Sequence, residues 1–239
     1  MGRTMRRSTI QPVQVFAALS FLIGVSVALA PLTPAQSVSG KAYGAFVQSP
    51  LGTQQSAVAV LPAVTADDGA MADDAADGMS VPGTITTDAL TGVTSGSVAD
   101  AAAAQSVATV FNVTLLNGLI TASSLTATVS STSDGAQATS NALGSTFGDL
   151  MVTGVQVTSG DGAIAPNTRM DLPGVGYVVL NEQLPTGDGV RSSGLTVNLI
   201  HVYLQTLTGG GCTLLGCVPG VLATTGEVIV GSATSNATM

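Results

Sequence analysis

Runs of β-branched, apolar and hydroxylated residues alternate with short turn signals over most of the chain. Two dipeptides, Asn117-Gly118 and Asp134-Gly135, each lie between such runs. Both are typical of type I′ hairpin turns, because the two central residues of that turn need a positive φ, which Asn, Asp and Gly tolerate. They predict a meander of three antiparallel strands, over residues 105–116, 119–133 and 136–151.

The two turns also predict how these strands pair. The first turn places Leu115 opposite Ile120, and the second places Val129 opposite Ser140. Residues 100–105, with the sequence DAAAAQ, lie just before the first strand and have a high helix propensity. Because propensity is a weak guide and a run of Ala also suits a strand of small side chains, we favour a strand here, with a short helix as the alternative.

Weaker alternation predicts further strands on both sides of the meander, over residues 38–61, 152–158, 177–183, 195–207 and 227–231. Both faces of the strand at 195–207 are largely apolar, which is typical of a central strand. These elements predict an all-β fold, an antiparallel β-sandwich built from hairpins and meanders. The alternative is a β-solenoid, which is less favoured because its parallel coils do not need two-residue turns.

The beginning of the chain has the pattern of an export signal. Basic residues at 3, 6 and 7 precede an apolar run over residues 15–30, and small residues follow at Ala35 and Ser37. The run is shorter than the roughly 20 apolar residues that a membrane helix needs. We therefore expect residues 1–37 to be a cleaved signal peptide and residues 38–239 to form a single β-rich extracellular domain, with an uncleaved membrane anchor as the alternative. The expected location is secreted or cell surface.

Charge then excludes one class of partner. Only three of the six basic residues, Lys41, Arg169 and Arg191, follow that signal, whereas all fourteen acidic residues do. No basic patch is present to neutralise phosphates, so we expect no nucleic-acid partner. Contact with a membrane is expected only through an uncleaved N-terminal segment.

Residues 65–78, TADDGAMADDAADG, are acidic and show no apolar period, which predicts a solvated surface loop. Calcium binding is an alternative for this segment, although its spacing is not that of an EF-hand loop. Cys212 and Cys217 lie in a Gly-rich string, and export to an oxidising compartment predicts a disulfide between them. A metal role is disfavoured, because no His or acidic residue lies near the two thiols in the sequence.

The chain has one histidine, His201, so any hydrolytic triad must use it. If Leu184 pairs with Leu195, two adjacent strands bring together four polar residues, Asn181, Glu182, Asn198 and His201. Buried polar side chains usually satisfy one another by hydrogen bonding, so we expect a structural polar network. A hydrolase centred on Glu182 and His201 stays an alternative, but no G-x-S-x-G motif supports it. We assign no catalytic, cofactor-binding or metal-binding residues.

Carbohydrate binding is a further alternative for an acidic β protein. Glu182 and Glu227 could supply a pair of carboxylates. The chain has no Trp and only three Tyr, which is few for a platform that stacks on sugars.

Four strings occur in order along the chain: LLNGLITASSLTATVSSTSDG (115–135), LPGVGYVVLNEQ (172–183), LTVNLIHVYL (195–204) and GEVIVGSA (226–233). Together they resemble the choice-of-anchor P family of exported bacterial surface proteins. The resemblance implies a surface or secreted β domain of unassigned biochemistry, and it carries over no catalytic or binding residue. We therefore expect a non-enzymatic structural or adhesive protein, whose partners are envelope or matrix components or further copies that pair through edge strands.

Overall fold

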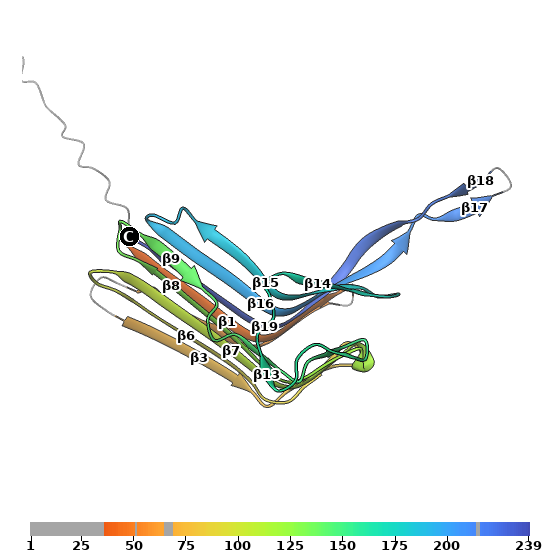
Figure 1. Ribbon diagram of the computed structural model, residues 1–239, viewed down its shortest axis with the longest axis horizontal. Helices are drawn as coiled ribbons and strands as arrows, with labels where there is room; N and C mark the ends of the chain where they lie inside the picture. The colour runs from red at the N-terminus through yellow and green to blue at the C-terminus, as the bar shows by residue number, and fades with distance from the viewer. Residues whose placement is uncertain (1–35, 51, 65–68, 214–215) are drawn as a thin grey trace, which may run out of the picture. The chain divides into compact units, whose positions relative to one another are not determined.

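The computed structural model describes residues 36–50, 52–64, 69–213 and 216–239, most of which belong to two large antiparallel sheets (Figure 1). The six-stranded sheet has its strands in the order β14 (Thr168–Leu172), β15 (Gly176–Gly187), β16 (Ser192–Thr208), β19 (Val221–Thr238), β1 (Ser37–Ser49) and β2 (Gly52–Val60).

The eleven-stranded sheet is built on the hairpin of β7 (Ala102–Leu115) and β8 (Ile120–Ser133), which the single turn η1 (Leu116–Gly118) connects. Two longer strands, β6 (Leu90–Val98) and β3 (Gly69–Ala76), follow beyond β7. The other strands of this sheet are short: β4 (Met79–Val81), β5 (Ile85–Thr87), β9 (Ala138–Asn141), β10 (Thr146–Gly148), β11 (Met151–Val152), β12 (Val155–Gln156) and β13 (Asp161–Gly162).

Every strand pair in the described part of the chain is antiparallel. The inner faces of the two large sheets share one apolar core, to which β1, β7, β8, β16 and β19 all contribute. The fold is therefore the predicted all-β antiparallel sandwich. Within the described ranges, no helix reaches the length and apolarity needed to cross a bilayer.

Small residues let the two sheets approach closely. A Cβ placed on Gly92 of β6 would lie 2.7 Å from the carbonyl oxygen of Ala57 and 3.0 Å from that of Ala42, both in the opposite sheet. Hydroxyl groups add direct bonds between the sheets, because the Ser106 Oγ donates to the Thr234 carbonyl at 2.7 Å. Buried polar groups in proteins are normally paired in this way, so some of the hydroxylated residues of the strands hold the two layers together.

Both sheets bend at a row of irregular residues. In the six-stranded sheet the row comprises Asn181, Leu199, Gly231, Gly44 and Ala57, each of which falls in a gap in the strand register. Three of these residues have a positive φ: Asn181 (50°), Ala57 (53°) and Gly231 (66°). The parity of the inward-facing positions switches at this row, so that β16 buries Leu195 and Val197 before the row and Ile200 and Val202 after it. Figure 1 shows the strands of this sheet bent at mid-length, with the other large sheet on the convex side.

The first predicted hairpin has the register that its turn implied, since Leu115 pairs with Ile120. The predicted alternative of a helix over residues 100–105 is excluded, because β7 begins at Ala102. The second register was wrong: Ser140 pairs with Ser131, not with Val129. Its cause is the Asp134 carboxylate, whose Oδ1 accepts the backbone N–H groups of Ala136 and Gln137 and holds a longer loop. The expected third strand is broken into β9, β10 and β11, each paired with β8.

The prediction of a surface loop over residues 65–78 was wrong for most of its length. Residues 65–68 lie outside the described residues, but β3 runs from Gly69 to Ala76 and pairs with β6. The Oδ2 atom of Asp74 accepts the backbone N–H of Val58 in β2 at 2.7 Å, which links the edges of the two sheets. A tertiary hydrogen bond therefore overrides the low strand propensity of Asp.

Two other predictions lie largely outside what the structure describes. The expected signal peptide, residues 1–37, falls outside the described residues except for Gln36 and Ser37, and β1 begins at Ser37. Cys212 and Cys217 pair directly across the small hairpin of β17 (Gly211–Thr213) and β18 (Gly216–Val218). The side chain of Cys212 lies outside the described set, so the disulfide stays a prediction.

Candidate functional site

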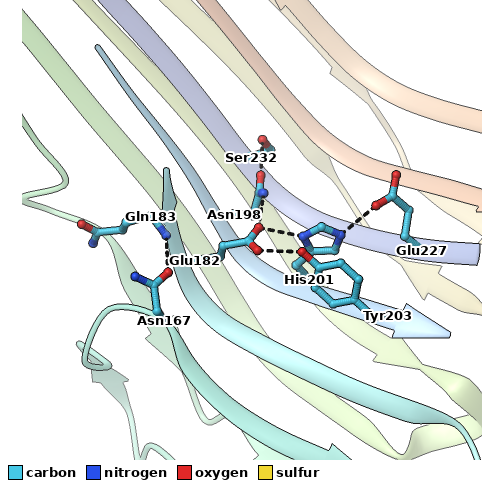
Figure 2. Close-up of polar contacts among 8 residues, drawn as sticks. All are labelled: Asn167, Glu182, Gln183, Asn198, His201, Tyr203, Glu227 and Ser232. Carbon is cyan, nitrogen blue, oxygen red and sulfur yellow. Dashed lines mark hydrogen bonds and ion pairs between the residues drawn. The ribbon is translucent and has the colours of Figure 1, made fainter. Parts of the chain in front are cut away.

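A group of polar side chains lies on the outer face of the six-stranded sheet, opposite the apolar core. We call it the His201 cluster, and it comprises Glu182 on β15, Asn198, His201 and Tyr203 on β16, and Glu227 and Ser232 on β19 (Figure 2). The bend places this face on the concave side of the sheet (Figure 1). Residues from either side of the bend therefore approach one another, and Asn198, His201 and Ser232 are buried although they lie on the face directed away from the eleven-stranded sheet.

Glu182 is the centre of the cluster. Its Oε2 accepts hydrogen bonds from Asn198 Nδ2 at 2.8 Å and His201 Nδ1 at 2.7 Å, and its Oε1 accepts one from the Tyr203 hydroxyl at 2.7 Å. Burial alone would raise the pKa of Glu182, but the hydrogen bonds from His201, Asn198 and Tyr203 outweigh it and lower that pKa to about 2. Glu182 is therefore a carboxylate at every pH above the strongly acidic range.

His201 lies between two carboxylates. Nδ1 is 2.7 Å from Glu182 Oε2, and Nε2 is 2.9 Å from Glu227 Oε2. Since an ionised carboxylate can only accept, each ring nitrogen must carry a proton to make these bonds. Burial alone would lower the pKa of His201, but hydrogen bonding and charge from Glu182 and Glu227 outweigh it and raise that pKa above its usual value. At a pH below this raised pKa, the ring is a buried imidazolium that donates on both sides.

Aromatic rings continue the cluster across the sheet. The His201 ring stacks on Tyr203 with a centroid separation of 4.0 Å, and Tyr203 stacks on Tyr177 at 4.6 Å. The Arg169 guanidinium lies over the outer face of Tyr177, 3.9 Å from its centroid. Burial, together with the hydrogen bond to Glu182, raises the pKa of Tyr203, so its hydroxyl stays a proton donor. Each of Tyr177 and Tyr203 therefore already stacks with two neighbouring groups, which limits the ring surface available for stacking on a sugar.

Ser232 on β19 and Tyr43 on β1 lie at one end of the His201 cluster. The Ser232 hydroxyl donates to Asn198 Oδ1 at 2.7 Å, which orients the amide so that its Nδ2 points at Glu182. Burial raises the pKa of Tyr43, whose side chain also hydrogen-bonds with Ser232. This outer face holds both glutamates, all three tyrosines and the single histidine of the chain. In a protein with only 3% aromatic residues, that is a strong concentration of chemistry in one place.

The structure brings together three of the four residues expected to form a polar network, namely Glu182, Asn198 and His201. Asn181 lies apart from them: its Nδ2 donates to the Ile164 carbonyl at 2.6 Å, and its Oδ1 accepts from Gln183 Nε2 at 3.1 Å. Its positive φ of 50° places it in the bend, which turns its side chain away from that of Glu182.

The expected pairing of Leu184 with Leu195 was wrong by one residue, since Leu184 pairs with Thr196. The Asp188 side chain is the cause, because its Oδ1 accepts the N–H groups of Val190, Arg191 and Ser192 and closes a loop of odd length. These bonds also lower the pKa of Asp188 to about 2. The shift places Glu182 directly opposite Asn198.

Sequence reasoning missed Tyr203, Glu227 and Ser232 as members of the cluster. Tyr203 carried a usable signal, since it shares a strand face with His201. Glu227 and Ser232 lie on β19, and nothing local in the sequence indicates that β19 would pair with β16.

While both ring nitrogens carry protons, His201 cannot act as a general base. A general base needs an unprotonated nitrogen within reach of a nucleophile. Both ring nitrogens of His201 donate to carboxylates, and the nearest hydroxyls in the cluster, those of Ser232 and Tyr203, donate to Asn198 and Glu182. In the described ranges, no group of three or more His, Cys, Asp or Glu side chains is placed to hold a metal ion.

Comparison with known proteins finds no matching family model, no matching curated protein and no matching solved structure. The resemblance to the choice-of-anchor P family therefore stays a prediction. A proposal for the function must therefore rest on the chemistry of the outer face of the six-stranded sheet.

Proposed function

We propose that this protein is an exported, non-enzymatic structural or adhesive protein that acts in the cell envelope or outside the cell. The observation that carries the proposal is the pair of hydrogen bonds that His201 makes, with Glu182 at 2.7 Å and with Glu227 at 2.9 Å. These hydrogen bonds occupy both ring nitrogens of His201, the one side chain on which acid–base hydrolysis would depend. The His201 cluster then stabilises the bent sheet, because its hydrogen bonds link β15, β16 and β19 across the bend.

Surface chemistry supports the same conclusion. Charged residues make up only 8% of the chain, and Ser, Thr and Gln occupy many of the exposed strand positions. Such faces suit recognition by shape and hydrogen bonding, without a reacting group. The expected signal over residues 1–37 and the resemblance to a family of exported proteins supply the location.

Export would also oxidise the two cysteines. The strand register sets Cys212 opposite Cys217, and a short loop closed in this way contributes about 2 kcal/mol to stability. The proposed disulfide would hold the β17–β18 hairpin in an oxidising compartment.

Two measurements test the proposal. Intact mass spectrometry of the native protein, taken separately from washed cells and from the medium, should find a chain that begins near Ser37. Full-length protein confined to the cytosol would contradict export.

Chromogenic esters, peptides and glycosides should be turned over no faster by the purified protein than by its His201→Gln variant. A turnover that this variant loses, while its circular dichroism spectrum is kept, would overturn the non-enzymatic assignment. Tyr203→Phe is the matched control, because it removes a hydroxyl from the cluster and leaves His201 in place.

A further inference from the structure

The ends of β16 and β19 leave the six-stranded sheet as a separate two-stranded ribbon. We call this the arm, formed by residues 205–208 and 221–224 and continued by the β17–β18 hairpin (Figure 1). The pairing of β15 with β16 ends at Leu204, and the pairing of β1 with β19 ends at Glu227. A register shift between Leu204 and Gln205 marks the point of departure. Among the described residues, the strands of the arm therefore pair only with each other.

Large apolar side chains of the arm face solvent. Leu207 is 64% exposed, Leu222 62% and Val221 69%. Leu207 and Leu222 lie directly opposite each other in the register, so they form one apolar pair on the same face. This face borders a depression of about 460 Å³ whose far side is the β14–β15 turn, with Pro173 and Val175. Nothing in the described part of one chain covers the pair.

The arm itself carries no charge, and the charged residues beside it, Arg169 and Asp171 at the edge of the depression, pair with each other. Residues 205–226 contain no Asp, Glu, Lys, Arg or His, whereas the whole chain carries fourteen acidic residues and a net charge of −8. Two copies repel each other over most of their surfaces. The arm is the place where they can approach without an electrostatic penalty.

An isolated two-stranded ribbon is only marginally stable in water, and three or more strands are needed for independent stability. The arm also has unpaired backbone groups along both outer edges, since residues 206–208 and 221–224 have no strand beside them on the outside. A lipid bilayer could cover the leucines but could not pair those backbone groups. A second arm can pair these backbone groups, because edge-to-edge pairing gives a four-stranded sheet, and it places the leucine pairs of the two arms side by side in contact on one face.

We propose that two copies of this chain associate through their arms, which pair edge to edge and bury Leu207 and Leu222 against the partner. This inference rests on the proposed structural function and adds a partner to it. Different measurements test the two proposals. Assembly is read from the mass of the protein in solution, whereas the proposed function is read from its location and activity.

The test is the mass of the purified protein in solution, measured by light scattering after size exclusion and by sedimentation over a dilution series. The wild-type protein should have twice the mass of one chain. High salt should leave this mass unchanged, since the contact contains no charged residue. Leu207→Glu and Leu222→Glu should each weaken association by about 10-fold or more, because each places a charge in an apolar contact.

Leu143→Glu is the matched control. Leu143 is 79% exposed and lies outside the arm, so this variant should associate as the wild type does. A monomeric wild-type protein across the whole dilution series would overturn the proposal, and this result does not depend on whether any variant folds. Equal association of the arm variants and the control would overturn it too. Binding of monomeric protein to phosphatidylcholine vesicles, lost in Leu222→Glu, would assign the arm to a lipid surface instead.

Discussion

Replacing Glu182 by Gln removes the negative charge from the centre of the His201 cluster and keeps the size of the side chain. The wild-type carboxylate accepts three hydrogen bonds, from Asn198, His201 and Tyr203, at 2.7 to 2.8 Å. It is also buried, with 10% of the side chain exposed. In the variant, the His201 imidazolium loses its closer counter-charge in a place that water does not reach.

The expected cost follows from two independent estimates. The pKa of Glu182 falls from 4.5 to about 2, and at 1.36 kcal/mol per unit this corresponds to about 3 kcal/mol at pH 6. Removing one partner of a buried ion pair typically costs about 3–5 kcal/mol. We therefore expect Glu182→Gln to lower the free energy of unfolding by about 3 kcal/mol. For a domain of this size, that is a fall in Tm of about 10 °C.

Urea denaturation at pH 6, followed by far-ultraviolet circular dichroism, measures this difference. Glu227→Gln is the matched control, because the Glu227 side chain is 30% exposed and makes one hydrogen bond to His201. It should cost only about 1 kcal/mol. The reasoning is refuted if Glu182→Gln unfolds within about 1 kcal/mol of the wild type, a difference typical of exposed ion pairs.

Three further predictions concern the His201 cluster and the close approach of the two sheets. The stability that Glu182 supplies should be lost as the pH falls from 4.5 toward about 2. The stability that His201 supplies should be full below about pH 6.5 and should be lost as the pH rises through the raised pKa of His201. The urea concentration at the unfolding midpoint should therefore be highest between these two limits, and a monotonic rise through pH 8 would contradict this. Tyr203→Phe should cost about 1 kcal/mol, because it loses the hydrogen bond to Glu182 and keeps the ring stack; the same urea assay checks it, and no loss would mean that the hydroxyl is hydrated. Gly92→Ala should cost about 1–3 kcal/mol or more because its Cβ meets two carbonyl oxygens, whereas Gly69→Ala, whose Cβ would lie 3.6 Å from the nearest atom, should be close to neutral; equal melting temperatures for the two variants would contradict the close approach of the sheets.

Local turn chemistry explains which parts of the fold were predictable. Asn117-Gly118 gave the correct register for β7 and β8 because both residues adopt a positive φ, 56° and 88°. Asp134-Gly135 looked equivalent, yet the Asp134 carboxylate captured two N–H groups and moved the pairing of Ser140 from Val129 to Ser131. A side chain that competes for backbone donors is not visible in a pattern of apolar and polar positions.

The bend explains why the candidate site was only partly predictable. Ala57 adopts a positive φ of 53°, although no property of Ala indicates this. The inward parity of β16 switches at Leu199, in the gap in register opposite Gly231, so that Asn198 and His201, three residues apart, lie on the same outer face (Figure 2). Regular alternation would separate them. Glu227 joins them through the pairing of β16 with β19, a long-range contact that only the folded chain defines.

The protonation state of His201 tests the central claim most directly. It is the only histidine in the chain, so its ring nitrogen signals in a ¹⁵N nuclear magnetic resonance spectrum need no assignment. If His201 is a structural cation between Glu182 and Glu227, both ring nitrogens should carry protons at pH 7, and the titration midpoint should lie above about 6.5. A ring with one unprotonated nitrogen at pH 7 and a midpoint below that value would contradict the account, because it would leave the imidazole free to act as a base.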